Sequence, residues 1–194
     1  MPEYDEKTAL VVVDIQNDFA DPKGSLYVEE GDQVVPVANR EIERALAAGG
    51  LVAYTQDWHP GSTPHFQKDG GVWPVHCVQG TWGAEFRPDL HLAGEVVRKG
   101  IGGEDGYSGF SVRDPMSGER DATELDRILR QRGVERIVIT GLATDYCVKE
   151  TAIDGIGLGY EVRIIAEGVR AVNLRPEDGK RALEEAVAAG ATLD

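Results

Sequence analysis

Residues 136–148 read Arg136-Ile137-Val138-Ile139-Thr140-Gly141-Leu142-Ala143-Thr144-Asp145-Tyr146-Cys147-Val148. The first five are rich in β-branched residues and lie between two glycines, which is typical of a buried parallel strand. Thr144 is a residue type that caps helices, and Asp145 suits a first helical turn. The stretch therefore predicts a strand, a glycine-containing turn and a helix, with Cys147 near the start of that helix.

The thiol of Cys147 has two interpretations. Backbone N–H groups and the dipole at a helix N-terminus lower the pKa of a thiol, which favours the nucleophilic thiolate. Cysteine is also common as a small apolar residue in protein cores. This stretch alone leaves both interpretations open.

The same alternation of strand and helix runs through the chain. Apolar runs predict strands at residues 8–13, 51–56, 95–99, 136–140 and 160–165, and a short sixth strand from residue 191. Helical spacing predicts helices over 34–48, 121–132 (with Asp121 as cap and Glu124 completing a capping box), 144–159 and from 176 onward. This pattern predicts an α/β fold of three αβα layers around a mostly parallel, Rossmann-like sheet of five or six strands. We expect residues 1–194 to form a single domain.

Composition narrows the classes of partner. The net charge is −14 without an offsetting basic stripe, which argues against nucleic acid and anionic membranes. No apolar run reaches the length of a membrane span, and the acidic start at residues 1–7 is unlike a secretory signal. The two cysteines make no disulfide framework, so we expect free thiols in the cytoplasm, with a Cys77–Cys147 disulfide as the alternative. The sequence leaves open whether the chain forms a homo-oligomer.

Three chemically distinct side chains follow predicted strands. Asp14, Lys99 and Cys147 each lie at, or within a turn of, a carboxyl end, which is the edge where open α/β sheets bind ligands. Singly, Asp14 could cap a helix and Lys99 could be a solvated strand end. Together they supply a base, a cation and a nucleophile, the parts needed for covalent acyl transfer.

A second group suggests a metal site. Asp57 and His59 lie two residues apart at another strand end, so their side chains can point the same way. His65 and His76 follow in an irregular segment of a length that is usually functional. One carboxylate with imidazoles suits zinc, iron or manganese as a divalent cofactor. The alternative is that these histidines cap loops or cover Trp73.

Six motifs, spread in order over nearly the whole chain, resemble those of nicotinamidases, which belong to the isochorismatase-like cysteine hydrolase superfamily. They are Val13-Asp14-Ile15-Gln16-Asn17-Asp18-Phe19, Asp57-Trp58-His59-Pro60, Trp73-Pro74-Val75-His76-Cys77-Val78-Gln79-Gly80-Thr81, Lys99-Gly100, Tyr107-Ser108-Gly109-Phe110 and Gly141-Leu142-Ala143-Thr144-Asp145-Tyr146-Cys147-Val148. The resemblance implies an isochorismatase-like fold.

The resemblance also implies a catalytic triad of Asp14, Lys99 and Cys147. Asp14 would take the thiol proton and later pass it to ammonia, while Lys99 favours the ionised thiol. Cys147 would attack a carboxamide carbon to form a thioester that water hydrolyses. The backbone N–H groups of Ala143 and Cys147 would bind the oxyanion, and the family's cis peptide is expected at Leu142–Ala143.

The remaining site residues are carried over in the same way. Asp57, His59 and His76 would be metal ligands, and His65 matches a fourth ligand found in some members. The metal would bind the ring nitrogen of the substrate. Phe19 and Trp73 would sandwich the ring, and Tyr107 would line the pocket. His91 matches no motif and is expected at the surface.

The implied function is a metal-dependent amidase that converts nicotinamide to nicotinate and ammonia, also accepts pyrazinamide, and serves NAD recycling. One alternative is another amidase of the superfamily, of the N-carbamoyl amide or isochorismate hydrolase type. Asp57, His59 and His76 speak against it, because those relatives generally lack the metal motif. The other alternative, a non-catalytic metal-binding scaffold, has no need of the triad.

Overall fold

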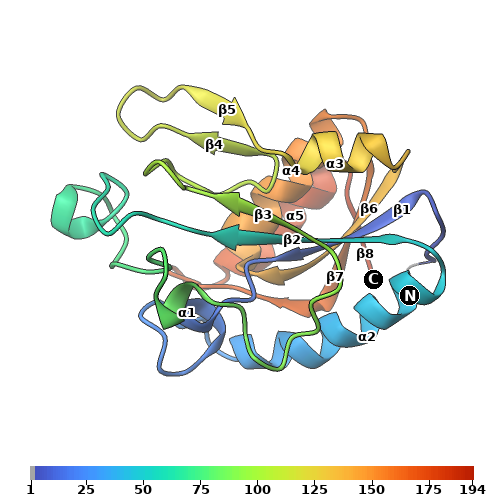
Figure 1. The fold of residues 1–194 in the computed structure, drawn as a ribbon, viewed down its shortest axis with the longest axis horizontal. Coiled ribbons are helices and arrows are strands. Elements are labelled where there is room, and N and C mark those ends of the chain that lie inside the picture. Colours follow the sequence, from blue (N-terminus) through green and yellow to red (C-terminus); the bar gives the residue numbers. More distant parts are fainter. Residues whose placement is uncertain (1–2) are drawn as a thin grey trace.

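The computed structural model describes residues 3–194 (Figure 1). Met1 and Pro2, the start of the acidic N-terminal stretch, lie outside the described residues. Six strands form one sheet in the order β3-β2-β1-β6-β7-β8, and every neighbouring pair is parallel. Their bounds are β1 Thr8–Val13, β2 Leu51–Asp57, β3 Glu95–Lys99, β6 Arg136–Leu142, β7 Glu161–Arg170 and β8 Thr192–Leu193. The prediction of a parallel sheet with a short sixth strand is confirmed.

Helices cover both faces of this sheet, which makes three layers (Figure 1). One face packs against α1 (Asn17–Ala20) and α2 (Val34–Ala47). The other packs against α3 (Leu125–Gln131), α4 (Lys149–Gly157) and α5 (Asp178–Ala189). Short helical turns complete the set: η1 Gly31–Gln33, η2 Gln67–Asp69, η3 Trp82–Ala84 and the π-helical η4 Thr144–Val148. None of the helices within residues 3–194 is long and apolar enough to cross a membrane.

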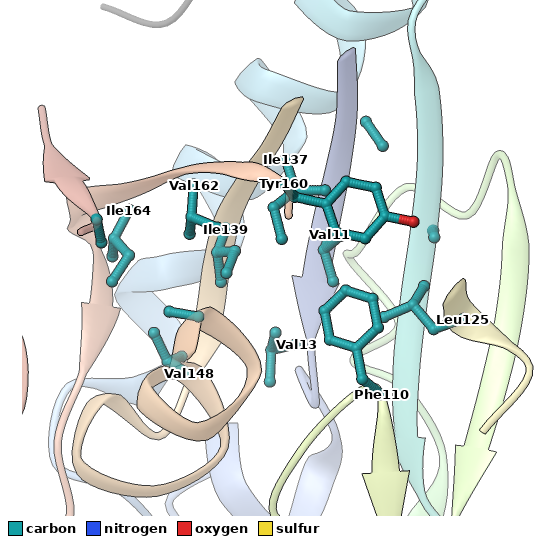
Figure 2. Packing of buried hydrophobic residues seen from close by; sticks show 14 of the residues in the cluster. Val11, Val13, Phe110, Leu125, Ile137, Ile139, Val148, Tyr160, Val162 and Ile164 are labelled. Atoms are coloured by element: carbon teal, nitrogen blue, oxygen red, sulfur yellow. The ribbon is translucent and has the colours of Figure 1, made fainter. Parts of the chain in front are cut away.

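The central strand β1 explains the two cores. Successive side chains of a strand point to opposite faces, so Val11 and Val13 join one apolar cluster while Leu10 and Val12 join the other. Figure 2 shows Val11 and Val13 packed with Phe110 and Leu125 in the first cluster. These four side chains are fully buried, which explains why the strand after Thr8 is a continuous apolar run instead of an alternating one.

The predicted helix over 121–132 begins later than expected. Residues 120–122 form strand β5 (Arg120–Ala122), which pairs antiparallel with β4 (Ser111–Arg113) in a hairpin that the glycine-rich sequence did not predict. The backbone groups of Asp121 are therefore in a ladder with Val112. The hydroxyl of Thr123 accepts a hydrogen bond from the N–H of Leu125 in place of the predicted Asp121 cap.

The sheet topology brings four strand ends to one place. In the register of the sheet, Val13 pairs with both Thr55 and Gly141, and Asp57 pairs with Lys99. Parallel neighbours end at the same edge. The residues that end or follow β1, β2, β3 and β6 therefore converge, although up to 133 positions (14 to 147) separate them in the sequence.

Candidate active site and metal cluster

Lys99 lies at the centre of the site, in contact with two carboxylates and a thiol. Its ammonium lies 2.7 Å from Oδ2 of Asp14, 2.5 Å from Oδ1 of Asp57 and 3.6 Å from Sγ of Cys147, and it also donates to the carbonyl of Gly106. The side chain is only 1% exposed. The structure thus brings Asp14, Lys99 and Cys147 together and excludes the alternative of a solvated Lys99.

Burial and charge together set the protonation of these groups. Burial alone would lower the pKa of the Lys99 ammonium, but Asp14 and Asp57 raise it well above its usual value. Burial raises the pKa of Asp14, against the opposing charge of Lys99. For Asp57 burial acts in the same sense, but Lys99 and the neighbouring imidazoles outweigh it and lower the pKa. Lys99 is therefore charged, Asp57 is ionised, and Asp14 is the carboxylate with the stronger tendency to hold a proton.

Asp14 is held in place by both backbone and side chain. It directly follows β1 and has a φ of 49°, a left-handed conformation that is uncommon for a non-glycine residue and is concentrated at functional sites. Its Oδ1 accepts a hydrogen bond of 2.7 Å from the hydroxyl of Thr55. One oxygen thus bonds Thr55 and the other bonds Lys99, so the carboxylate is fixed beside the thiol.

Cys147 lies near the start of a helix, as predicted, but its turn is the π-helical η4, which runs directly into α4, and Thr144 does not cap it. The expected low thiol pKa is also wrong: burial raises the pKa well above its usual value, and Lys99 opposes this shift without reversing it. The reason is that the thiol is 7% exposed and has two carboxylates within 4.8 Å. A protonated thiol needs a base at the moment of attack, and Asp14 is within reach. The Leu142–Ala143 peptide is cis, as the resemblance implies.

The three histidines expected at the metal site face one another. A nitrogen from each of His59, His65 and His76 lies within 4.8 Å of the other two. His59 is fully buried, yet neither of its ring nitrogens has a hydrogen-bond partner among the described residues. Buried polar atoms are normally bonded, so this orphaned imidazole fits a metal ligand. His91 is exposed, as expected.

Asp57 connects the histidines to the triad. Its Oδ1 bonds Lys99, while Oδ2 lies 3.6 Å from Nε2 of His59 and 3.9 Å from Nε2 of His76. The side-chain amide of Gln16 donates to the carbonyl of Asp57 and accepts from its N–H, which fixes the end of β2. Burial lowers the pKa of His76 to about 4, so its imidazole is neutral, as metal binding requires.

The site opens into an aromatic cavity. Its lining includes the predicted residues Phe19, Trp73 and Tyr107 together with Ala143 and Cys147. The indole N–H of Trp73 donates to the hydroxyl of Tyr107 at 2.8 Å, and burial raises the pKa of Tyr107 to about 12, so the hydroxyl stays neutral. A flat, uncharged ring would meet apolar faces here and a thiol at the end of the cavity.

Three contributors were not predicted from the sequence. Thr55 bonds Asp14, Tyr146 lines the cavity beside Cys147, and Asp105 bonds Nδ1 of His65 at 2.6 Å. Burial would raise the pKa of Asp105, but hydrogen bonds from His65 and Arg113 lower it, so it is ionised. The sequence offers only weak signals for these three residues. Thr55 is a polar residue inside an apolar strand, Tyr146 is an aromatic residue next to Cys147, and Asp105 is a carboxylate in a glycine-rich loop.

Comparisons with known proteins show the family to which this chain belongs. The isochorismatase domain matches residues 8–193. The nicotinamidase of Escherichia coli (strain K12) is 42% identical over 95% of this chain and 93% of its own. The structure of Pyrococcus horikoshii pyrazinamidase in complex with zinc superposes with a TM-score of 0.86 at 41% identity, covering 97% and 98% of the two chains. A structure from L. infantum in complex with nicotinate gives 0.88 at 32% identity, covering 100% and 95%. This chain belongs to the isochorismatase family.

Proposed function

We propose that the chain hydrolyses nicotinamide to nicotinate and ammonia, accepts pyrazinamide as a second substrate, and so serves NAD recycling. One observation carries this proposal: the Cys147 thiol, the Lys99 ammonium and the Asp14 carboxylate meet at the end of an aromatic-lined cavity beside three clustered histidines. A scaffold that only binds metal would have no use for the buried triad.

The first half of the reaction uses Asp14 as base and then as acid. As the sulfur of Cys147 bonds to the carboxamide carbon, the thiol proton passes to Asp14 and the carbonyl electron pair moves onto oxygen. The N–H groups of Ala143 and Cys147 would stabilise this oxyanion. When the C–N bond breaks, Asp14 returns the proton to nitrogen, ammonia leaves and a thioester remains.

The second half regenerates the thiol. The ionised Asp14 takes a proton from a water molecule as its oxygen attacks the thioester carbon. Collapse of that intermediate breaks the C–S bond, and the sulfur recovers a proton from Asp14. Nicotinate leaves, and its carboxylic proton goes to solvent. Lys99 stays charged throughout and keeps Asp14 beside the reacting sulfur.

The residues present fit a divalent metal. Asp57, His59 and His76 would hold zinc, iron or manganese, with His65 as a fourth ligand. When bound, such an ion supplies a Lewis acid and an anchoring point for the ring nitrogen. We further expect a cytoplasmic setting, because Cys77 and Cys147 are free, buried thiols.

Ammonia release tests this proposal directly. We expect the metal-loaded protein to release ammonia from nicotinamide and pyrazinamide, and Cys147→Ala to fold and bind metal without turnover. Cys77→Ala is the matched control, because it removes the other buried thiol and should keep turnover per folded molecule. Ammonia from an N-carbamoyl amide but not from nicotinamide would favour the other class of amidase.

A further inference from the structure

An unpredicted chain of charged contacts leads from the protein surface to the histidine cluster. Nδ1 of His65 lies 2.6 Å from Oδ1 of Asp105, and Oδ2 of Asp105 accepts a hydrogen bond of 3.0 Å from Nη2 of Arg113. His65 and Asp105 are buried, whereas the Arg113 side chain is half exposed. The order from outside to inside is therefore cation, carboxylate, imidazole.

The geometry of this chain determines which nitrogen of His65 is available. Both oxygens of Asp105 are placed as acceptors, Oδ2 for the guanidinium of Arg113 and Oδ1 opposite Nδ1 of His65, so Nδ1 carries the proton and donates to Asp105. Nε2 is then the unprotonated nitrogen, the form that binds a metal. The ring of His65 also stacks on that of His59, with centroids 4.7 Å apart and planes 19° apart, which limits its rotation.

Asp105 itself is fixed by the β4–β5 hairpin. Its N–H donates to the carbonyl of Arg113 at 2.7 Å, and the N–H of Arg113 donates back at 3.0 Å. The loop that carries His65 is tied to the same segment, since Thr63 donates through its hydroxyl to the carbonyl of Gly103 at 2.5 Å, two residues before Asp105. The carboxylate thus meets the imidazole from a backbone position that two hydrogen bonds to Arg113 fix, and the two loops are joined next to this contact.

We propose that Asp105 is the positioning residue that makes His65 a metal ligand, by fixing its tautomer, ring orientation and basicity from the hairpin. This inference rests on the metal site of the proposed function. Partners of this kind change metal affinity by about 10–100-fold when they are removed. Arg113 should matter less, because ion pairs of exposed side chains contribute little.

Metal affinity gives a readout that is independent of activity. Zn²⁺ binding to the metal-free protein would be measured by competition with a chromophoric chelator. We expect Asp105→Ala to weaken binding about 10–100-fold, and Asp105→Asn, which keeps a hydrogen-bond acceptor, to weaken it less. Asp121→Asn is the matched control, because it removes an exposed carboxylate from the same hairpin, and it should leave the affinity unchanged.

A double-mutant cycle identifies the residue through which Asp105 acts. In a His65→Ala background, Asp105→Ala should cause no further loss, and the ligand-field absorption of the Co²⁺-loaded Asp105→Ala protein should shift toward that of His65→Ala. Two results would overturn the role of Asp105 and leave the metal site standing. One is equal Zn²⁺ affinity of the unaltered and Asp105→Ala proteins. The other is a full additional loss of Zn²⁺ affinity when Asp105→Ala is added to His65→Ala. If Asp105→Ala does not fold, the same comparisons apply to Asp105→Asn. If the unaltered protein takes up no Zn²⁺, the metal site fails together with this role.

Discussion

Lys99 shows how a buried charge can be essential without being a net source of stability. Its ammonium separates two buried carboxylates, those of Asp14 and Asp57. Taking three charges out of water is costly, and their mutual attraction compensates only while all partners remain. Removing the cation would leave two like charges facing each other in a buried site.

We therefore expect Lys99→Met to destabilise the protein by about 3–5 kcal/mol, the usual cost of breaking a buried ion pair. Urea unfolding would measure this change in free energy, and the exposed Lys23→Met variant should stay within about 0.5 kcal/mol of the unaltered protein. The double variant Asp14→Asn/Lys99→Met should lose less than the sum of the single changes. If the changes in the free energy of unfolding of the two single variants simply add in the double variant, Asp14 and Lys99 are not coupled.

His76 makes the stability of the metal-free protein depend on pH. Its pKa is about 4 in the folded chain against 6.5 as the usual value, so between these values the unfolded chain binds a proton that the folded chain does not. Stability should then fall as pH falls through this window, by about 2 kcal/mol between pH 7.5 and 5 for this group. Urea midpoints at the two pH values would measure it. His76→Gln should reduce this loss of stability, and the exposed His91→Gln should not. Equal losses in the unaltered protein and both variants would refute the assignment of the pH dependence to His76.

At the scale of the element, the junction of β1 and β6 depends on Gly141. Its φ is 124°, and a Cβ there would lie 2.0 Å from the carbonyl oxygen of Val13 on the paired strand. Any side chain would push the two strands apart immediately before Asp14 and Ala143. The close pairing that unites the site thus requires glycine here.

Gly141→Ala should destabilise the protein by about 2–4 kcal/mol, from overpacking and backbone strain together. Gly133 is the matched control, since it also has a positive φ of 66°, but a Cβ there would meet no atom of residues 3–194 within 4 Å beyond its chain neighbours. Gly133→Ala should cost only about 1 kcal/mol. Thermal melting would rank the two variants, and a reversed or equal ranking would show that the contact with Val13 is not limiting.

At the scale of the whole molecule, metal binding should stabilise the fold, because the candidate ligands are brought together only when the chain is folded. Asp57 ends β2, while His65 and His76 lie in the irregular segment between β2 and β3. An ion that binds only the folded state stabilises it by about 2.7 kcal/mol at one hundred times its Kd.

For a chain of this size that gain should raise the melting temperature by about 5–10 °C. Melting curves recorded with chelator and with added Zn²⁺ would measure the shift. His59→Ala should abolish most of it, whereas His91→Ala, an exposed histidine outside the cluster, should retain it. An identical shift in the melting temperature of the His59→Ala protein would show that the stabilising metal binds at another site.

The amino-acid sequence by itself determined the local elements and the chemistry at their ends. Strands such as Thr8–Val13 could be predicted because burial on both faces requires an unbroken apolar run. Asp14, Lys99 and Cys147 could be singled out because each lies at, or within about a turn of, the carboxyl end of a predicted strand, the edge where such sheets bind ligands. These signals depend only on neighbouring residues in the chain, so they can be recognised in the amino-acid sequence.

Only the tertiary structure decided how those ends meet and what environment they create. Pairing of β1 with β2 and β6, and of β2 with β3, places Asp14 beside Lys99 and Cys147, and no local pattern specifies this strand order. The β4–β5 hairpin and the contact of Asp105 with His65, which are 40 residues apart, depend on segments that meet only in the folded chain. The thiol pKa was predicted in the wrong direction because it depends on burial and on carboxylates from other strands. Burial is a property of the packed molecule, so it cannot be read from neighbours in the chain.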